Sequence, residues 1–176
     1  MEFAETKLKG AFVIAPDRRE DSRGFFARAF CRTEFEQHGL NATVVQCNLS
    51  FSERRGTVRG LHYQVAPRAE CKLVRCVRGS IFDVIVDLRP SSPARLQWVA
   101  VNLSADNRSA LFVPEGFAHG FQTLEDRSEV LYQVSEFYSP EHERGLRWND
   151  PAFAINWPIA ATIISERDQN HPDFLK

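Results

Sequence analysis

Short apolar runs, each ended by a turn-forming residue, follow one another along most of this chain. Between about Val44 and Tyr138 the runs are rich in β-branched and aromatic residues, as in CKLVRCVRG, SIFDVIVDLR, LQWVAVNLS and SEVLYQVSEFY. This pattern is typical of antiparallel β-strands. Many short strands with little helix favour a closed barrel or a double-sheet jelly roll, because both arrangements deal with exposed strand edges. We therefore predict an all-β fold.

One of these runs alternates in a way that indicates a cavity. In SIFDVIVDLR, one set of alternate positions is apolar and comprises Phe82, Val84, Val86 and Leu88. The positions between them hold Asp83, Ile85 and Asp87. Because successive side chains of a strand point to opposite faces, one face is apolar and the other presents two carboxylates. We expect this strand to line a cavity.

Helical signals are few. The run Thr33-Glu34-Phe35-Glu36 matches a capping box, and Gly39 supplies a C-terminal stop, so a short helix is predicted between them. A second short helix is expected in the tail after Trp157. No internal repeat, low-complexity tract or linker interrupts the pattern, which predicts a single domain over residues 1–176.

Composition narrows the functional classes. The 176 residues are 43% hydrophobic, and 22 Lys+Arg nearly balance 23 Asp+Glu, so the net charge does not favour binding to nucleic acid or to a membrane. No apolar run is long enough to span a bilayer, and the first ten residues lack a signal-peptide pattern, so we expect a cytoplasmic protein. The cysteines form no C-x-x-C pair and are expected to be reduced thiols: Cys31, Cys47, Cys71 and Cys76.

Three clusters mix polar groups into apolar strands: RGLHYQ, PEGFAHG, and Leu131-Tyr132 with Phe137-Tyr138. In the first, His62 follows Gly60, whose missing side chain would let a ligand or another backbone come close. Metal-binding cupins usually carry an H-x-H pair here, but the residues two before and two after His62 are Gly60 and Gln64. Only the second cupin motif, P-x-G-x-x-H, is intact, and it ends at His119. We therefore predict no metal centre.

Acid–base chemistry is the second possibility. It needs a base, a group that orients the base, a donor for the developing oxyanion and an acid on the opposite face. The chain offers His62, Asp168, Lys72 and Tyr132 for these roles. Each of the last three also has a structural explanation: Asp168 can cap a helix, Lys72 can lie on a solvated face, and Tyr132 can fill the core. Spacing alone leaves both interpretations open.

The chain resembles the dTDP-4-dehydrorhamnose 3,5-epimerase family in ten fragments that occur in order between about Asp21 and Asp168. These are DSRGFF, QCN, VRGLHYQ, CKLVR, GSIFDVIVDLR, PEGFAHGF, EVLYQ, EFYSP, GLRWNDP and SERD. The resemblance implies an RmlC-like cupin, a double-sheet jelly roll with a few short helices that forms a homodimer. It implies a dTDP-linked 4-keto-6-deoxy sugar as substrate, inverted at the carbons beside the ketone, with no metal or redox cofactor.

The same resemblance implies roles for individual residues. His62 is the expected base, Asp168 its orienting carboxylate, Tyr132 the acid and Lys72 the cation that stabilises the enolate. Arg23 and Arg59 are expected to bind the diphosphate, and Tyr138 to stack on thymine. Further expected substrate contacts are Gln46, Asn48, His119, Glu143 and Arg167. We add the hypothesis that Asp83 holds His119 in one tautomer.

Three positions depart from the family pattern. Arg28 and Cys47 stand where acidic residues are common, and Arg167 replaces the usual Lys before the terminal Asp. They bear on which nucleotide is bound more than on the reaction. The alternatives are a mono-epimerase that inverts only C3 or only C5, a non-catalytic cupin that binds a sugar nucleotide, and a metal-dependent cupin oxygenase, which the missing H-x-H disfavours.

Overall fold

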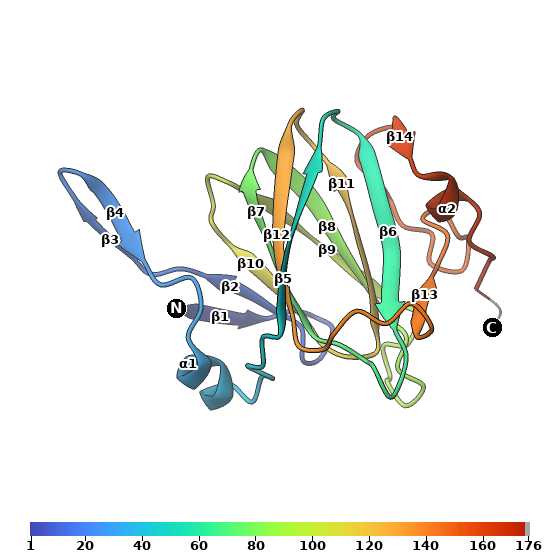
Figure 1. Ribbon diagram of the computed structural model, residues 1–176, viewed down its shortest axis with the longest axis horizontal. Helices are drawn as coiled ribbons and strands as arrows, with labels where there is room; N and C mark the ends of the chain where they lie inside the picture. Colours follow the sequence, from blue (N-terminus) through green and yellow to red (C-terminus); the bar gives the residue numbers. More distant parts are fainter. Residues whose placement is uncertain (175–176) are drawn as a thin grey trace.

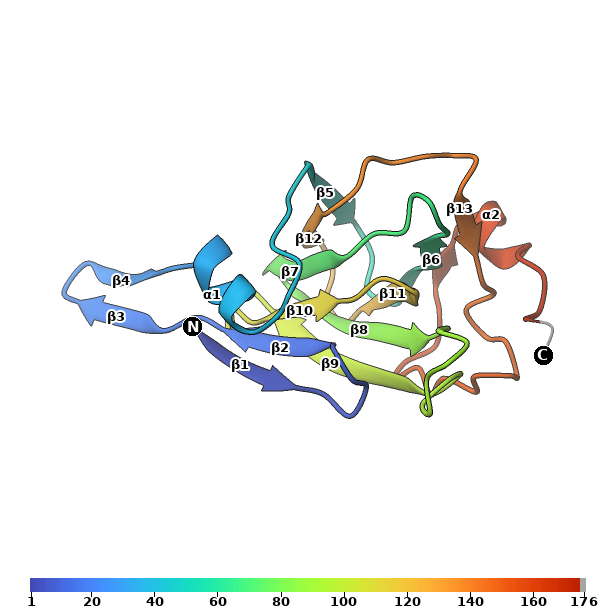
Figure 2. The same ribbon diagram turned by 90° about the horizontal axis from the view of Figure 1, so that it is seen from below.

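Two antiparallel β-sheets face each other, with a hairpin and two short helices outside them (Figure 1 and Figure 2). The structure, a computed structural model, describes residues 1–174. The facing sheets confirm the predicted all-β jelly roll. In this part of the chain, neither helix has the length and apolar character needed to cross a membrane.

The first sheet has six strands in the order β1-β2-β10-β7-β12-β5. Their bounds are Glu2–Glu5 (β1), Phe12–Ala15 (β2), Ala110–Val113 (β10), Lys72–Arg78 (β7), Ser128–Val134 (β12) and Gln46–Ser52 (β5). At one edge, β5 pairs antiparallel with β12, so that Asn48 lies opposite Tyr132. This pair borders the space between the sheets.

The second sheet has the order β13-β6-β11-β8-β9, and β14 pairs parallel with β6. Its strands are Glu143–Gly145 (β13), Thr57–Gln64 (β6), Phe117–Thr123 (β11), Ser80–Asp87 (β8), Trp98–Ser104 (β9) and Ile163–Ile164 (β14). The pairing of β6 with β11 places His62 opposite His119. Two of the polar segments found in the sequence are therefore neighbours in space.

Strand β8 illustrates how the main core is built. Ile85 packs with the core residues between the sheets, whereas Val86, on the other face, packs with Phe153 of the C-terminal segment. Asp83 and Asp87 share the inward face with Ile85, as the alternation predicts. Because the first sheet covers one face of β8 and the C-terminal segment covers the other, no residue of β8 lines the main cleft. The expectation that this strand lines a cavity is wrong.

Helix α1 (Arg32–Gln37) covers a second apolar cluster on the outer face of the first sheet. Its Phe35 is 1% exposed and anchors the helix there. The helix begins after Cys31, whose side chain makes no cap hydrogen bond, so Thr33 lies within the first turn and the capping-box prediction is wrong. Gly39, with φ +69°, follows the end of the helix as predicted.

A hairpin formed by β3 (Arg18–Asp21) and β4 (Gly24–Ala27) projects away from the two sheets, at the left of Figure 1. Its Phe25 and Phe26 are 44% and 72% exposed. Neighbouring large apolar side chains on an exposed arm are typical of a surface that contacts another molecule.

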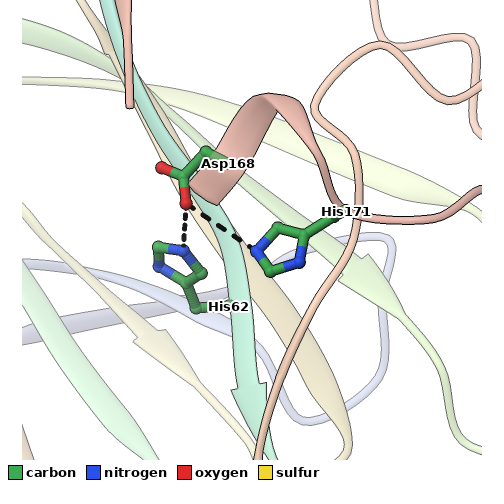
Figure 3. A group of neighbouring side chains, drawn as sticks. All are labelled: His62, Asp168 and His171. Carbon is green, nitrogen blue, oxygen red and sulfur yellow. Dashed lines mark hydrogen bonds and ion pairs between the residues drawn. The ribbon is translucent and has the colours of Figure 1, made fainter. Parts of the chain in front are cut away.

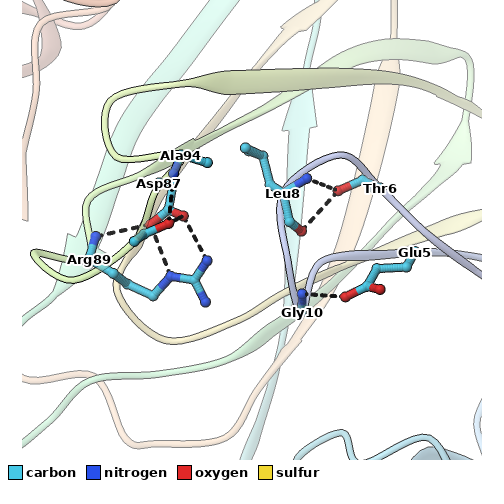
Figure 4. Close-up of polar contacts among 8 residues, drawn as sticks. Glu5, Thr6, Leu8, Gly10, Asp87, Arg89 and Ala94 are labelled. Carbon is cyan, nitrogen blue, oxygen red and sulfur yellow. Dashed lines mark hydrogen bonds and ion pairs between the residues drawn. The ribbon is translucent and has the colours of Figure 1, made fainter.

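Two loops meet beside the main core (Figure 4). The β1–β2 loop buries Leu8 completely, and Gly10 of the same loop lies beside Arg89 from the loop after β8. Asp87 is 0% exposed and accepts hydrogen bonds from Arg89 Nε (2.9 Å), Arg89 Nη2 (2.7 Å) and Ser92 Oγ (2.6 Å). Burial acts to raise the pKa of Asp87, but these hydrogen bonds hold it below its ordinary value. The buried carboxylate is therefore charged.

Candidate active site

A cleft between the sheets gathers nearly all the predicted site residues. It consists of two adjoining cavities of about 400 and 320 Å³, which share His62, Lys72 and Tyr132. Of the predicted residues, the larger cavity also holds Arg59, His119, Arg167 and Asp168, and the smaller holds Gln46, Asn48, Tyr138 and Glu143. Among the predicted residues, Arg23 alone lines neither cavity.

His62 and Asp168 form a hydrogen-bonded pair in the larger cavity (Figure 3). His62 Nε2 lies 2.7 Å from Asp168 Oδ1, and the Gly60 N–H donates to Asp168 Oδ2 over 3.1 Å. Burial acts to raise the pKa of Asp168, but the hydrogen bond and charge of His62 hold it below its ordinary value. A carboxylate in this position accepts a hydrogen bond from the Nε2–H group of a neutral imidazole. The other ring nitrogen, Nδ1, then carries no proton and is the basic one.

Asp168 reaches the cleft from helix α2 (Glu166–Gln169), which confirms the short helix predicted after Trp157. Ser165 caps this helix, because its Oγ accepts a hydrogen bond from the Asp168 N–H over 3.1 Å. The side chain of Asp168 is thereby left to bind His62. The structural interpretation of Asp168 as the helix cap is wrong.

Gly60 allows the close packing behind this pair. Its φ of +110° is a conformation that side chains rarely adopt, and a Cβ at this position would lie 2.7 Å from Gly120 Cα and 2.8 Å from His119 O. The missing side chain therefore lets the backbone of β11 come close, as the sequence suggested. The Gly60 N–H faces Asp168.

His119 lies in the same cavity and contacts Asp83 of β8. Its Nε2 is 2.8 Å from Asp83 Oδ1, and the two residues are 8% and 0% exposed. The expected contact between them is confirmed. Because the carboxylate accepts from Nε2, it orients the imidazole and leaves Nδ1 as the nitrogen without a proton when the ring is neutral.

Tyr132 and Lys72 come from the first sheet, whereas His62 comes from the second. Burial, followed by the charge of Glu70, raises the pKa of Tyr132, so its phenol is protonated near neutral pH. Lys72 Nζ lies 3.0 Å from Glu70 Oε1, and the two side chains are 12% and 10% exposed. Lys72 is therefore not on a solvated face, and the cleft holds an imidazole on one wall and a phenol and an ammonium on the other.

Polar side chains bind one another at the smaller cavity. Glu143 Oε2 accepts from Tyr138 Oη over 2.7 Å and pairs with Arg167 Nη2 at 2.5 Å. Burial acts to raise the pKa of Glu143, but Arg167 and Tyr138 hold it below its ordinary value. Gln46 Oε1 accepts from the Tyr138 N–H over 2.8 Å, which fixes the backbone that carries the exposed ring.

Arg59 is positioned at the other end of the cleft. It donates from Nε to Ser52 Oγ (3.1 Å) and from Nη2 to the Phe51 carbonyl (2.8 Å). With Arg167 it places two guanidinium groups on the larger cavity. Paired guanidinium groups are well suited to binding a diphosphate.

Arg23 lies on the turn of the projecting hairpin, and its side chain is 89% exposed. It pairs with Asp21 of the same hairpin, with Nη2 2.5 Å from Oδ2. Figure 1 shows this hairpin pointing away from the sheets that form the cleft. One chain therefore does not bring Arg23 together with Arg59.

Some residues that line the cleft were not predicted from the sequence. Ser50 and Glu70 line the cavities. Ser50 continues the alternation of Gln46 and Asn48 along β5, which is a signal the sequence carries.

Two of the three departures from the family pattern lie outside the cleft. Cys47 falls between the cleft-lining positions of β5, is exposed and belongs to the opposite face of that strand. Arg28 pairs with Glu34 at 3.1 Å and lines neither cavity. The third departure, Arg167, is in the cleft.

The sequence of this chain is similar to those of known sugar-nucleotide epimerases. The family profile described as dTDP-4-dehydrorhamnose 3,5-epimerase matches residues 5–176. A protein of that name from Sinorhizobium fredii is 46% identical over 177 residues, which covers 100% of this chain and 91% of the relative.

The fold of this chain closely resembles that of solved epimerase structures. A dTDP-4-dehydrorhamnose 3,5-epimerase from Bacillus anthracis, solved with TDP and PPi bound, aligns with a TM-score of 0.95 and 43% identity, covering 98% of this chain and 99% of that one. ChmJ, a 3'-monoepimerase from Streptomyces bikiniensis solved with dTDP-quinovose, has a TM-score of 0.88 and 33% identity, covering 96% and 85%. The similarity to the double epimerase is the higher of the two.

Proposed function

This chain belongs to the dTDP-4-dehydrorhamnose 3,5-epimerase family, as its sequence fragments predicted, and from that premise we propose how its cleft converts dTDP-4-dehydro-6-deoxy-D-glucose to dTDP-4-dehydro-L-rhamnose. The observation that carries the proposal is the 2.7 Å contact between His62 and Asp168 inside the cleft. Asp168 accepts a hydrogen bond from the Nε2–H group of His62. The unprotonated Nδ1 of His62 then removes the hydrogen from a carbon beside the sugar ketone. The ketone makes that hydrogen acidic because the resulting carbanion is delocalised as an enolate.

The enolate places negative charge on the former carbonyl oxygen. Lys72 is suited to stabilise this charge, because its side chain is mostly buried and water screens its ammonium little. Glu70, 3.0 Å from Lys72 Nζ, holds the ammonium in place. The ion pair lines the cavity that also holds His62 and Tyr132, so the cation and the two proton-transfer groups serve one substrate position.

Inversion requires the proton to return from the other face of the sugar ring. Tyr132 belongs to β12 of the first sheet and His62 to β6 of the second, so a ring bound between the sheets has one group on each side. The raised pKa of Tyr132 keeps the phenol protonated and ready to donate. Because C3 and C5 flank the same ketone, a modest turn of the sugar presents each carbon to the same two groups.

The nucleotide part of the substrate binds to other residues of the cleft than those that act on the sugar. Arg59 and Arg167 bind the diphosphate by guanidinium hydrogen bonds, His119 Nδ1 accepts a hydrogen bond from the sugar, and Tyr138 stacks on the thymine. Exposure of 57% leaves the Tyr138 ring available for such stacking, while its hydroxyl is bound to Glu143. Cytoplasmic localisation remains the prediction made from the sequence.

Incubation with dTDP-4-dehydro-6-deoxyglucose in D2O, followed by NMR, tests the reaction. We expect deuterium at both C3 and C5 and accumulation of the L-sugar. Exchange at one carbon alone would identify a mono-epimerase. Binding of the nucleotide sugar without any exchange would identify the non-catalytic cupin. His62→Ala should abolish exchange at both carbons, and unchanged turnover in this variant would refute the assignment of the base.

We further propose that the protein is a homodimer in which the hairpin of one protomer reaches the cleft of the other. Two observations support this: Phe25 and Phe26 are exposed on the arm, and Arg23 lies on its turn, away from the cleft of its own chain. Docking of the arm would bury the two rings and bring Arg23 to the diphosphate bound by Arg59.

Mixed dimers distinguish this arrangement from a site made by one chain. Arg23→Ala and His62→Ala subunits should each form inactive or weakly active homodimers. In a mixed dimer, one cleft combines an intact His62 with an intact Arg23 from the other subunit, so activity should return. If Arg23 acts within its own chain, both clefts of the mixed dimer stay defective and no activity returns. Sedimentation velocity would confirm that the dimers form.

A further inference from the structure

His171 lies next to the proposed base but has no part in the mechanism above. It follows α2, and its ring lies at a T-shaped angle to the ring of His62 with the centroids 6.0 Å apart (Figure 3). The side chain is 14% exposed, and its buried Nε2 has no hydrogen-bond partner among the described residues. A buried nitrogen without a partner is uncommon and calls for an explanation.

The ring of His171 occupies space that a glycine leaves open. It packs over Gly145 of β13, where a Cβ would overlap the imidazole. Gly145 pairs directly with His62 across the β13–β6 ladder. The sheet therefore seats His171 beside the catalytic pair rather than leaving it on the surface.

Three ligand atoms converge at this point. Asp168 Oδ1 lies 2.7 Å from His62 Nε2 and 3.8 Å from His171 Nε2, and all three atoms lie within 4.8 Å of one another. The buried Nε2 of His171 makes no hydrogen bond among the described residues, so it is free to bind an ion at this point. Two imidazole nitrogens and one carboxylate oxygen form a ligand set that suits zinc and cobalt and leaves a coordination position open.

We infer that His62, Asp168 and His171 form an inhibitory site for a divalent transition-metal ion. The ion binds His62 Nε2, and the proton that this nitrogen donated to Asp168 is replaced by one taken up from solvent at Nδ1, so the ring stays a neutral imidazole. With Nδ1 protonated, His62 cannot remove a hydrogen from the substrate, and catalysis stops. The inhibitory effect rests on the proposed role of His62 as the base, whereas the binding of the ion does not.

Binding is measured first, on the whole protein without substrate. Co2+ is titrated while its visible absorption is recorded, because low-coordinate Co2+ absorbs much more strongly than the hydrated ion, and Zn2+ is titrated by calorimetry. His171→Phe keeps an aromatic ring over Gly145 but removes the ligand nitrogen. The matched control is His38→Asn, at the end of α1 and outside the cleft.

We expect one ion per chain in the unmodified protein and in His38→Asn, and binding at least about tenfold weaker in His171→Phe. Gly145→Ala, which keeps all three ligands but displaces the ring, should weaken binding in the same direction. Zn2+ should inhibit epimerisation with a matching affinity, and His171→Phe should relieve this inhibition while keeping its basal turnover. Mg2+ should not inhibit, because it prefers oxygen ligands.

Several results would overturn the inference. These are Co2+ spectra and Zn2+ affinity unchanged in His171→Phe, stoichiometric binding lost in His38→Asn, or Zn2+ inhibition that persists equally in His171→Phe. A protein that binds one Zn2+ through His171 yet shows no exchange of substrate hydrogens in D2O would retain the metal site and refute the proposed function instead. The two claims therefore fail separately.

Discussion

Replacement of Asp168 by asparagine tests the catalytic pair with a minimal change of shape. Both oxygens of the carboxylate accept hydrogen bonds: Oδ1 from His62 Nε2 at 2.7 Å and Oδ2 from the Gly60 N–H at 3.1 Å. An amide has only one oxygen, so it cannot accept both. If its oxygen faces His62, its NH2 group opposes the Gly60 N–H. If its NH2 group faces His62, it donates to Nε2 and moves the ring proton to Nδ1, the nitrogen that must act as the base.

The size of the effect follows from the bond that is lost. A hydrogen bond to a charged group contributes about 1.5–3 kcal/mol. At about 1.4 kcal/mol for each factor of ten, Asp168→Asn should lower kcat roughly 10- to 150-fold. KM should change little, because Asp168 orients His62 and has no assigned contact with the nucleotide. The loss should appear equally in hydrogen exchange at C3 and C5, since one base serves both carbons.

Steady-state turnover and NMR exchange rates in D2O provide the measurement. Asp106→Asn is the matched control, because it makes the same change at an exposed residue that lines neither cavity. Thermal unfolding of both variants separates loss of catalysis from loss of folded protein. A kcat for folded Asp168→Asn within about threefold of the unmodified protein, below the lost-bond range, would refute the role of Asp168 in selecting the tautomer.

Three other changes have distinct expected outcomes. Tyr132→Phe should lower product formation by about 10²- to 10⁴-fold while exchange with D2O continues at a higher rate than inversion, because His62 can still remove and return a proton; equal rates of exchange and inversion would contradict this. Gly60→Ala should lower the free energy of unfolding, measured in urea, by at least about 2 kcal/mol, because its φ and the contact with Gly120 both oppose a Cβ. Asp87 has a lowered pKa when folded, so its contribution to stability is complete above the unfolded value of about 3.9 and is lost as pH falls through the folded pKa. Urea unfolding from pH 6 to pH 2 should show this acid-side loss, and an Asp87→Asn variant should show less of it.

Local patterns in the sequence predicted most of the fold because the period of a strand is short. The alternation through Asp83, Ile85 and Asp87 correctly placed both carboxylates on one face of β8. The same alternation could not show what covers the other face. That face is packed against the C-terminal segment around Phe153, a contact between residues far apart in sequence. Burial on both faces, rather than a cavity, is therefore the result of tertiary packing.

The catalytic set was named from the resemblance, whereas its geometry depends on packing that spacing does not encode. His62 and Asp168 meet because Gly60 lets β6 approach β11 and because Ser165 caps a helix that ends beside them. The place of Arg23 could not be predicted from its motif either. A motif identifies a ligand-binding side chain but does not say whether that side chain acts in its own chain or in a partner.

The division of groups between the sheets explains why an all-β sandwich suits this reaction. Inversion needs two groups fixed on opposite faces of a planar enolate, and two sheets provide two walls whose separation is set by the core between them. His62 on β6 and Tyr132 on β12 each sit within a hydrogen-bonded ladder, so neither can move toward the other without breaking strand pairs. Asp168 is the exception, since it reaches the cleft from a short helix outside both sheets. The component that selects the protonation state of the base is therefore positioned from outside the two sheets, and substitutions that displace Asp168 should alter catalysis without disturbing the sandwich.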